Sequence, residues 1–177
     1  MQQRAEDFDV VVLGAGAAGM TAALVAAIEG LRTLLIERSS QIGGTTALSS
    51  GSVWIPDNPQ QRRFGISEDA AAARAYLDAL VGARAERALR EAFLAAGPEM
   101  LAYLESRADV GFQMYRHSPD YRQELPGAAA GGRPLEPLPF DGRTLGQNFD
   151  RVRAPIPELT LFGGMMVTRG EAARLLR

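Results

Sequence analysis

Three glycines and one downstream carboxylate have the spacing of a dinucleotide site. Gly14, Gly16 and Gly19 follow a run of β-branched residues, and Glu37 comes 18 residues after the last glycine. Gly14 would permit a tight turn, Gly16 would let a pyrophosphate approach the backbone, and Gly19 would let a helix pack closely on a strand. The helix N-terminus would attract phosphates, and Glu37 would accept hydrogen bonds from ribose hydroxyls. The whole pattern predicts a dinucleotide site, with an unliganded tight turn as the alternative.

The connection after Glu37 is polar and rich in small residues. It contains Gly43 and Gly44, followed by the hydroxyl residues Thr45 and Thr46 and by further serines. Such a loop would allow close approach to a diphosphate, a ribitol chain or the edge of a flavin ring. A flexible surface loop has the same composition, so composition alone leaves both interpretations open.

A strand, a helix and a second strand must position these residues. Residues 8–13 are continuous, apolar and β-branched, which is typical of a fully buried strand, and residues 33–36 repeat the pattern. Between them we expect an Ala-rich helix that ends near Glu29, with Gly30 at positive φ. The predicted fold class is α/β: a Rossmann-like dinucleotide-binding βαβ unit with an incomplete parallel sheet, followed by a helical and loop-rich segment.

Helices are predicted in the middle of the chain. We expect one over residues 67–81 with Ser67 as its N-cap, and a second over residues 84–96. Gly97-Pro98 then predicts a break, followed by a third helix that ends near Arg107.

The C-terminal part shows little periodicity. Residues 110–165 are rich in proline and glycine and predict a loop-dominated stretch, and residues 168–177 predict the start of a further helix. We assign residues 1–60 to the N-terminal part of the cofactor domain, and residues 61–177 to its continuation toward a substrate cleft. Because two strands are too few for a doubly wound sheet, we expect the N-terminal part of a longer protein, which would be poorly soluble or molten alone.

The composition excludes several kinds of chemistry. All 19 basic residues are arginine, and the net charge of −2 lacks the basic excess of a general nucleic-acid binder. Without cysteine, disulfides, thiolate metal sites and cysteine nucleophiles are excluded. The single histidine, His117, leaves little scope for a metal site or a Ser-His-Asp triad. We predict no metal and, because cysteine-free chains suit reducing compartments, a cytoplasmic location.

One uncharged run is long enough to raise the question of a membrane span. Residues 10–28 carry no charge, which approaches the length of a transmembrane helix. Three glycines interrupt the run, and the acidic residues Glu6, Asp7 and Asp9 precede it, whereas a signal peptide has a basic flank. We therefore predict no integral membrane segment and no targeting segment.

Several longer motifs resemble a known family. The segment Asp9-Val-Val-Val-Leu-Gly-Ala-Gly-Ala-Ala-Gly, together with Leu35-Ile-Glu-Arg and Gly43-Gly-Thr-Thr, resembles the FAD-binding segment of the fumarate reductase/succinate dehydrogenase flavoprotein superfamily. Within that superfamily, Ser49-Ser-Gly-Ser-Val-Trp-Ile-Pro, Ala75-Tyr-Leu, Pro119-Asp-Tyr and Gly131-Gly-Arg-Pro-Leu-Glu-Pro resemble the 3-ketosteroid dehydrogenase branch. The resemblance extends over nearly the whole chain, which corresponds to about the first third of such an enzyme.

This resemblance implies a cofactor and a reaction. The residues that would hold FAD are Gly14, Gly16, Ala18, Gly19, Glu37, Arg38, Gly44, Thr45, Thr46, Ser50 and Gly51. The family removes two hydrogens from adjacent carbons beside a ketone, one as a proton and one as a hydride to the flavin. Tyr121 matches an auxiliary catalytic tyrosine, while the principal base belongs to a later part of such enzymes. The implied partners are a hydrophobic, steroid-like ketone and an external electron acceptor.

Alternatives remain open for the substrate and for single residues. The chain could instead belong to a fumarate- or succinate-type enzyme of small carboxylic acids, or to a non-catalytic dinucleotide-binding module. Tyr121 could be a surface or packing residue, with Tyr115 as the fallback catalytic tyrosine. We expect His117 to be solvated, Trp54 to pack in a core, and Arg133 and Arg143 to be exposed.

Overall fold

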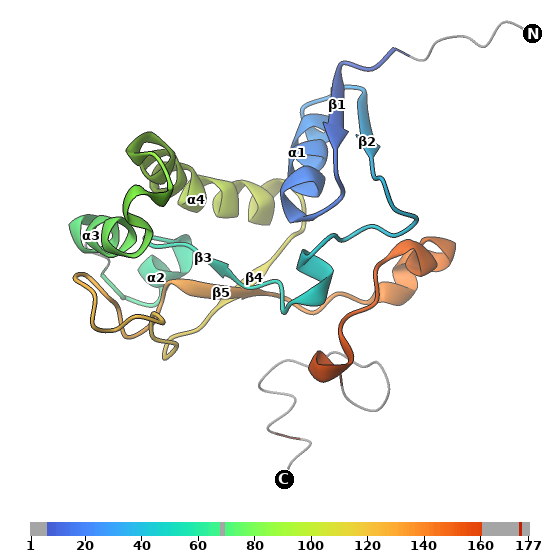
Figure 1. Ribbon diagram of the computed structural model, residues 1–177. Coiled ribbons are helices and arrows are strands. Elements are labelled where there is room, and N and C mark those ends of the chain that lie inside the picture. Colours follow the sequence, from blue (N-terminus) through green and yellow to red (C-terminus); the bar gives the residue numbers. More distant parts are fainter. Residues whose placement is uncertain (1–6, 68–69, 161–173, 175–177) are drawn as a thin grey trace, which may run out of the picture. The chain divides into compact units, whose positions relative to one another are not determined.

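The computed structural model describes residues 7–67, 70–160 and 174 (Figure 1). The chain divides into two compact units: unit 1 comprises residues 1–51 and 139–177, and unit 2 comprises residues 52–138. The predicted assignment of residues 1–60 and 61–177 to parts of one cofactor domain stays a prediction. The helix predicted over residues 168–177 lies outside the described residues.

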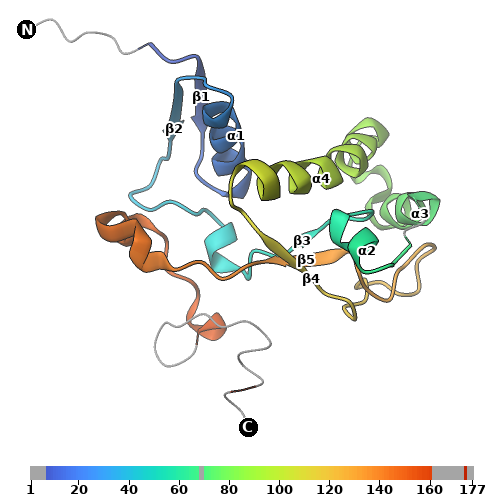
Figure 2. The ribbon, with the colours of Figure 1, turned by 180° about the vertical axis from the view of Figure 1, so that it is seen from behind.

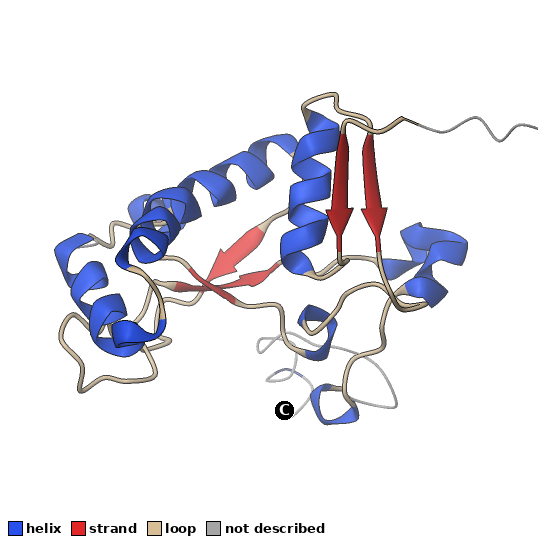
Figure 3. Cartoon of the chain, turned by 45° about the horizontal axis from the view of Figure 1, so that its top comes forward, coloured by secondary structure: helices blue, strands red, loops and turns tan. Residues whose placement is uncertain are grey.

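Unit 1 contains the expected strand, helix and strand. Strand β1 (Val10–Leu13) runs parallel to β2 (Thr33–Ile36), and helix α1 (Ala17–Ile28) connects them (Figure 3). The register pairs Val10 with Thr33, and an ion pair between Arg32 and Asp9 joins the starts of the strands at 3.2 Å. Gly30, at φ +84°, ends the helical segment as predicted. The small parallel sheet and its connecting helix are confirmed.

The burial predicted for β1 is wrong for the described chain. Val11 is 53% exposed and Leu13 is 77% exposed, so the strand alternates between half-buried and exposed positions. Helix α1 contacts both strands and β2 pairs with one edge of β1, but among the described residues no second layer shields Val11 and Leu13. Unit 1 also contains the short 3₁₀ helices η1 (Thr46–Leu48) and η4 (Pro157–Leu159), and the 3₁₀ segment η3 (Gly142–Arg151), which kinks at the non-helical Gly146.

Unit 2 combines helices with a small antiparallel sheet that sequence reasoning missed (Figure 2). The sheet order is β3 (Val53–Trp54), β5 (Pro134–Pro137) and β4 (Phe112–Met114). The central strand looks unlike a strand in sequence because a proline stands at each end, and proline usually marks strand ends or edges. Leu135, in its middle, is fully buried. The predicted loop-dominated stretch therefore supplies two of the three strands.

The predicted helix break at Gly97-Pro98 is also wrong. Helix α4 (Arg87–Arg107) continues through both residues, because Leu101 and Leu104 on its second half are buried against the rest of unit 2. A Cβ added at Gly97 would lie 3.0 Å from a methyl carbon of Ile55. Glycine therefore serves close packing here, and burial of the apolar face outweighs the hydrogen bond that proline removes.

The other helices of unit 2 are α2 (Pro59–Arg63), α3 (Ala70–Val81) and the 3₁₀ turn η2 (Gly82–Arg84). The predicted end of α3 at Gly82 is confirmed, and residues 68 and 69, which follow the predicted N-cap Ser67, lie outside the described residues. The hydrophobic core consists of Ile55, Leu101, Met114 and Leu135.

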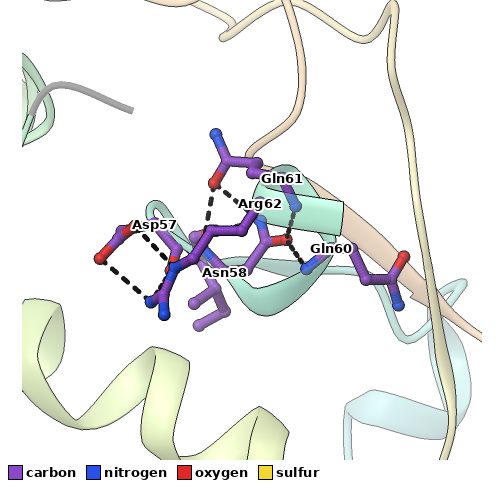
Figure 4. Close-up of polar contacts among 6 residues, drawn as sticks. Asp57, Asn58, Gln60, Gln61 and Arg62 are labelled. Atoms are coloured by element: carbon purple, nitrogen blue, oxygen red, sulfur yellow. Dashed lines mark hydrogen bonds and ion pairs between the residues drawn. The ribbon is translucent and has the colours of Figure 1, made fainter. Parts of the chain in front are cut away.

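A buried polar cluster starts α2 (Figure 4). The Asn58 side chain accepts hydrogen bonds from the backbone N–H groups of Gln60 and Gln61, at 3.1 and 3.0 Å. The Gln61 side chain accepts from the Asn58 N–H at 3.0 Å, which completes a capping box. Gln60 accepts from the Met114 N–H at 2.8 Å and so ties the helix to β4. The exposed ion pair of Arg62 and Asp57 flanks the cluster.

Candidate cofactor-binding site

The three glycines form the turn between β1 and α1, and each meets a different requirement. Gly14 has φ +99°, and its N–H donates to the carbonyl of Ile36 at 2.7 Å, which ties the turn to the end of β2. A Cβ at Gly19 would lie 1.8 Å from the Gly14 carbonyl oxygen, whereas a Cβ at Gly16 would have no heavy atom within 4 Å. Gly19 therefore permits close packing, and Gly16 leaves open space over the turn.

The polar loop after β2 packs against this turn. The Gly43 N–H donates to the Ala15 carbonyl at 2.7 Å, and the Thr46 hydroxyl accepts from the Ala17 N–H at 3.3 Å. A Cβ at Gly44 would lie 3.1 Å from the Cα of Gly16. These contacts are local and specific, so the loop forms a second wall of the site rather than an independent surface loop.

Glu37 joins the turn and the loop through its carboxylate. One oxygen accepts from the Ala15 N–H at 2.9 Å, and the other accepts from the Ser39 N–H at 3.0 Å. These two hydrogen bonds lower the pKa of Glu37 below its ordinary value of 4.5, so the side chain is ionised at neutral pH. A carboxylate has about four acceptor positions, so the group retains capacity for ribose hydroxyls.

The remaining predicted cofactor residues are less constrained. Ala18 lies in the first turn of α1, and the side chains of Arg38, Thr45 and Ser50 are exposed. Gly51 has φ +70° and donates from its N–H to the Ser49 hydroxyl at 3.1 Å. The structure thus brings together Gly14, Gly16, Gly19, Glu37, Gly44 and Thr46. The cofactor-binding role of every predicted residue stays a prediction.

The predicted catalytic residue, Tyr121, belongs to unit 2. Its side chain is fully exposed, so its catalytic role stays a prediction. The preceding residue, Asp120, is buried instead of exposed. Its carboxylate accepts hydrogen bonds from the Arg133 guanidinium at 2.7 Å and from the Trp54 indole at 2.6 Å. Asp120 also accepts from the Ala129 N–H at 2.9 Å. These bonds fix the base of the loop that carries Tyr121.

Sequence reasoning missed this network and misplaced one of its members. Arg133 was expected at the surface, but it is 1% exposed and lies near the rings of Trp54 and Tyr76. A buried guanidinium requires a charged partner, and nothing local in the sequence identifies Asp120, 13 positions earlier, as that partner. Trp54 packs near Tyr76 and Phe93, as the prediction of core packing requires.

The other candidate side chains lie outside the turn. Arg143 is exposed and paired with Asp141 at 2.6 Å, and His117 is exposed; both positions agree with the predictions. The Tyr115 hydroxyl donates to the Glu136 carboxylate. Within the described parts of the chain, no cluster of three or more metal-ligating side chains occurs. No helix among the described residues has the length and apolar character needed to cross a membrane.

This geometry fits a dinucleotide. Open space over Gly16, an N-terminal helix turn without acidic residues, and an ionised carboxylate at the end of β2 provide places for a diphosphate and a ribose. The site therefore defines a dinucleotide-binding protein of the α/β class.

The comparison with family models identifies the family. The chain belongs to the FAD binding domain family, whose model matches residues 9–174. It is 45% identical to a 3-oxosteroid 1-dehydrogenase of Mycobacterium tuberculosis over 141 residues, which cover 80% of this chain and 25% of the relative. It is 43% identical to a 4-oxocyclohexanecarboxylate 2-dehydrogenase of Sinomonas cyclohexanicum over 148 residues, which cover 83% of this chain and 26% of the relative.

A solved structure agrees with these relatives. The crystal structure of 3-ketosteroid delta1-dehydrogenase from Sterolibacterium denitrificans, in complex with 1,4-androstadiene-3,17-dione, matches 96% of this chain with a TM-score of 0.85 and 37% identity. The match covers 30% of that enzyme, so this chain spans about a quarter to a third of the length of its relatives. These similarities confirm the resemblance to 3-ketosteroid dehydrogenase-like flavoproteins, and the family match confirms FAD as the cofactor.

Proposed function

We propose that the full-length protein is an FAD-dependent dehydrogenase that removes two hydrogens from adjacent carbons beside the ketone of a 3-ketosteroid-like substrate. The observation that carries this proposal is the match of 96% of the chain, at a TM-score of 0.85, to a steroid-bound 3-ketosteroid delta1-dehydrogenase. Bound FAD would supply the hydride acceptor, and an external electron acceptor would reoxidise it. A cytoplasmic location remains part of the proposal, on the ground of the cysteine-free sequence.

The residues of unit 1 would hold the cofactor. The open backbone over Gly16 and the N-terminus of α1 would bind the diphosphate. Glu37 would accept from the ribose hydroxyls, since its carboxylate is ionised and already fixed by two backbone N–H groups. Thr46 and Gly44 would extend the wall beside the diphosphate, in line with their contacts to the turn.

Tyr121 would act in the substrate cleft as an auxiliary catalytic residue. A phenol hydroxyl can hold a proton and share it through hydrogen bonds while a ketone enolises. The buried carboxylate of Asp120 fixes the backbone next to it, and the tyrosine side chain makes no competing packing contact because it is fully exposed.

A second candidate changes the substrate and keeps the chemistry. The relative at 43% identity is named for 4-oxocyclohexanecarboxylate, a small cyclic ketone that carries a carboxylate. A keto acid of this kind would require a cationic group in the substrate site, whereas a steroid would require an apolar cleft. Both substrates present a ring ketone with hydrogens on adjacent carbons.

Steady-state reduction of a dye acceptor by the full-length flavoprotein would test both candidates. We expect turnover with a 3-ketosteroid to exceed turnover with 4-oxocyclohexanecarboxylate. The reverse preference would select the keto acid, and no turnover with either would remove the proposed activity.

The same assay would test Tyr121. In Tyr121→Phe we expect kcat per bound flavin to fall by about ten-fold or more, because an auxiliary residue should contribute at or below the low end of the roughly 10²–10⁴-fold range of acid–base groups, with unchanged flavin content and melting temperature. Tyr115→Phe is the matched control: its hydroxyl bonds to Glu136, so its loss should lower the melting temperature and leave kcat nearly unchanged. Equal kcat values for wild type and Tyr121→Phe would make Tyr121 a surface residue.

A further inference from the structure

Arg153 lies in unit 1, beside the cofactor site, although it is far from the glycine turn in sequence. The Ile42 N–H donates to the Arg151 carbonyl at 2.7 Å, and the Arg153 N–H donates to the Ile42 carbonyl at 2.9 Å, in the manner of a parallel bridge. The next residue, Gly43, donates to the Ala15 carbonyl at 2.7 Å. A continuous set of backbone hydrogen bonds therefore positions Arg153 relative to the turn.

The side chain of Arg153 reaches the surroundings of Glu37. One terminal nitrogen lies 3.5 Å from the Ser39 hydroxyl, and the Ser39 N–H donates to the Glu37 carboxylate at 3.0 Å. The Arg153 Nε is buried and has no hydrogen-bond partner among the residues that the structure describes. Buried donors in folded proteins are almost always paired, so this nitrogen requires an acceptor from elsewhere.

The residue Arg153 also borders an open cavity. Arg153 lines an open cavity of about 920 Å³ together with Phe149, Asp150, Val152 and Pro155. The cavity belongs to unit 1, as does the glycine turn. A side chain with an unpaired buried donor and an open approach is arranged to bind an acceptor-rich group.

We propose that Arg153 is a further cofactor-binding residue, whose guanidinium donates to the adenosine diphosphate half of FAD. That half carries the negative charge of the cofactor and many acceptor atoms, which suit the planar, permanently charged donor fork of arginine. It is also the half whose ribose Glu37 would hold, and Glu37 is linked to Arg153 through Ser39. The competing explanation is structural: Arg153 would only hold the loop at Ser39.

Titration of the full-length apoprotein with FAD, followed by flavin fluorescence, would test the assignment. We expect Arg153→Gln to raise the dissociation constant of FAD, and that of ADP measured by competition, by about ten-fold or more. The melting temperature of the apoprotein should change little. Arg143→Gln is the matched control, because Arg143 lines the same cavity but is exposed and paired with Asp141, and we expect its constants to equal those of wild type.

Two results would overturn the proposal. The first is an unchanged dissociation constant of FAD in Arg153→Gln. The second is a loss of FAD affinity in a variant that binds ADP like wild type and whose apoprotein melts at a lower temperature, as the structural explanation requires. If Arg153→Gln does not fold, Arg153→Lys provides the test, since lysine keeps the positive charge but lacks the planar set of N–H donors of arginine. Weakened FAD and ADP binding by that folded variant would support the proposal, and wild-type constants would contradict it.

Discussion

Unit 1 buries little side-chain surface, whereas unit 2 buries a hydrophobic cluster and a polar network. Among the described residues of unit 1, Ala15 is the only fully buried hydrophobic residue, and Leu13 is 77% exposed. In unit 2, Leu101, Leu135 and Arg133 are each at most 1% exposed. Backbone hydrogen bonds and glycines shape the cofactor turn, while side chains hold the loop of Tyr121. A site that is formed by backbone atoms leaves open space that a ligand can occupy, whereas a network of buried side chains fills the interior that it forms.

The largest expected effect comes from closing the space between helix and turn. In Gly19→Ala, the added Cβ would lie 1.8 Å from the Gly14 carbonyl oxygen, so α1 must move away from the turn. We expect FAD affinity to fall by about 100-fold or more, and the apoprotein to melt at lower temperature. Flavin content after dialysis and a thermal melt measure the two effects.

A neighbouring glycine separates the ligand effect from the folding effect. In Gly16→Ala, the new methyl group meets no protein atom within 4 Å, so the apoprotein should melt like wild type while FAD binding weakens. If Gly16→Ala retained FAD as wild type does, the diphosphate would not lie over this turn.

In unit 2, the largest expected effect concerns the buried ion pair. Asp120→Ala would leave the Arg133 guanidinium buried without its carboxylate. Removing one member of such a pair costs about 3–5 kcal/mol of unfolding free energy, which denaturant unfolding of the full-length protein would measure. Arg62→Ala is the control: its pair with Asp57 is exposed, and we expect a loss of about 1 kcal/mol or less. Similar losses in both variants would contradict the expected contrast between the buried and the exposed ion pair of unit 2.

A smaller effect is expected at Glu37. Glu37→Ala removes one charged acceptor for the ribose, and we expect FAD affinity to fall by about ten-fold or more. Because the pKa of this carboxyl lies below 4.5, wild-type affinity should not change through Glu37 between neutral and mildly acidic pH. The group loses its charge, and with it this contribution, as the pH falls through the lowered pKa. Titrations with FAD at several pH values would show both effects, and an unchanged affinity in the variant would remove Glu37 from the site.

Much of the cofactor site was predictable from sequence because its geometry is local. Gly14 and Gly30 have positive φ and Gly19 makes a close contact, so these three positions suit a residue without Cβ, while Gly16 leaves open space over the turn. Glu37 follows at the spacing that one strand–helix–strand unit imposes. The strand–helix–strand pattern itself was predictable from the continuous apolar runs and from the glycine after the helix.

Tertiary structure alone decided the features that depend on distant partners. Helix α4 continues through Pro98 because its buried face packs near Ile55, a residue more than 40 positions earlier. Strand β5 exists because β3 and β4 pair with both of its edges, and Arg133 is buried because Asp120 and Trp54 surround it. The sequence by itself determined the glycine turn between β1 and α1, since backbone sterics act between neighbours. The tertiary structure decided that the charge of Arg133 could be buried and that prolines could stand inside α4 and at the ends of β5, since their cost depends on partners that the fold brings together.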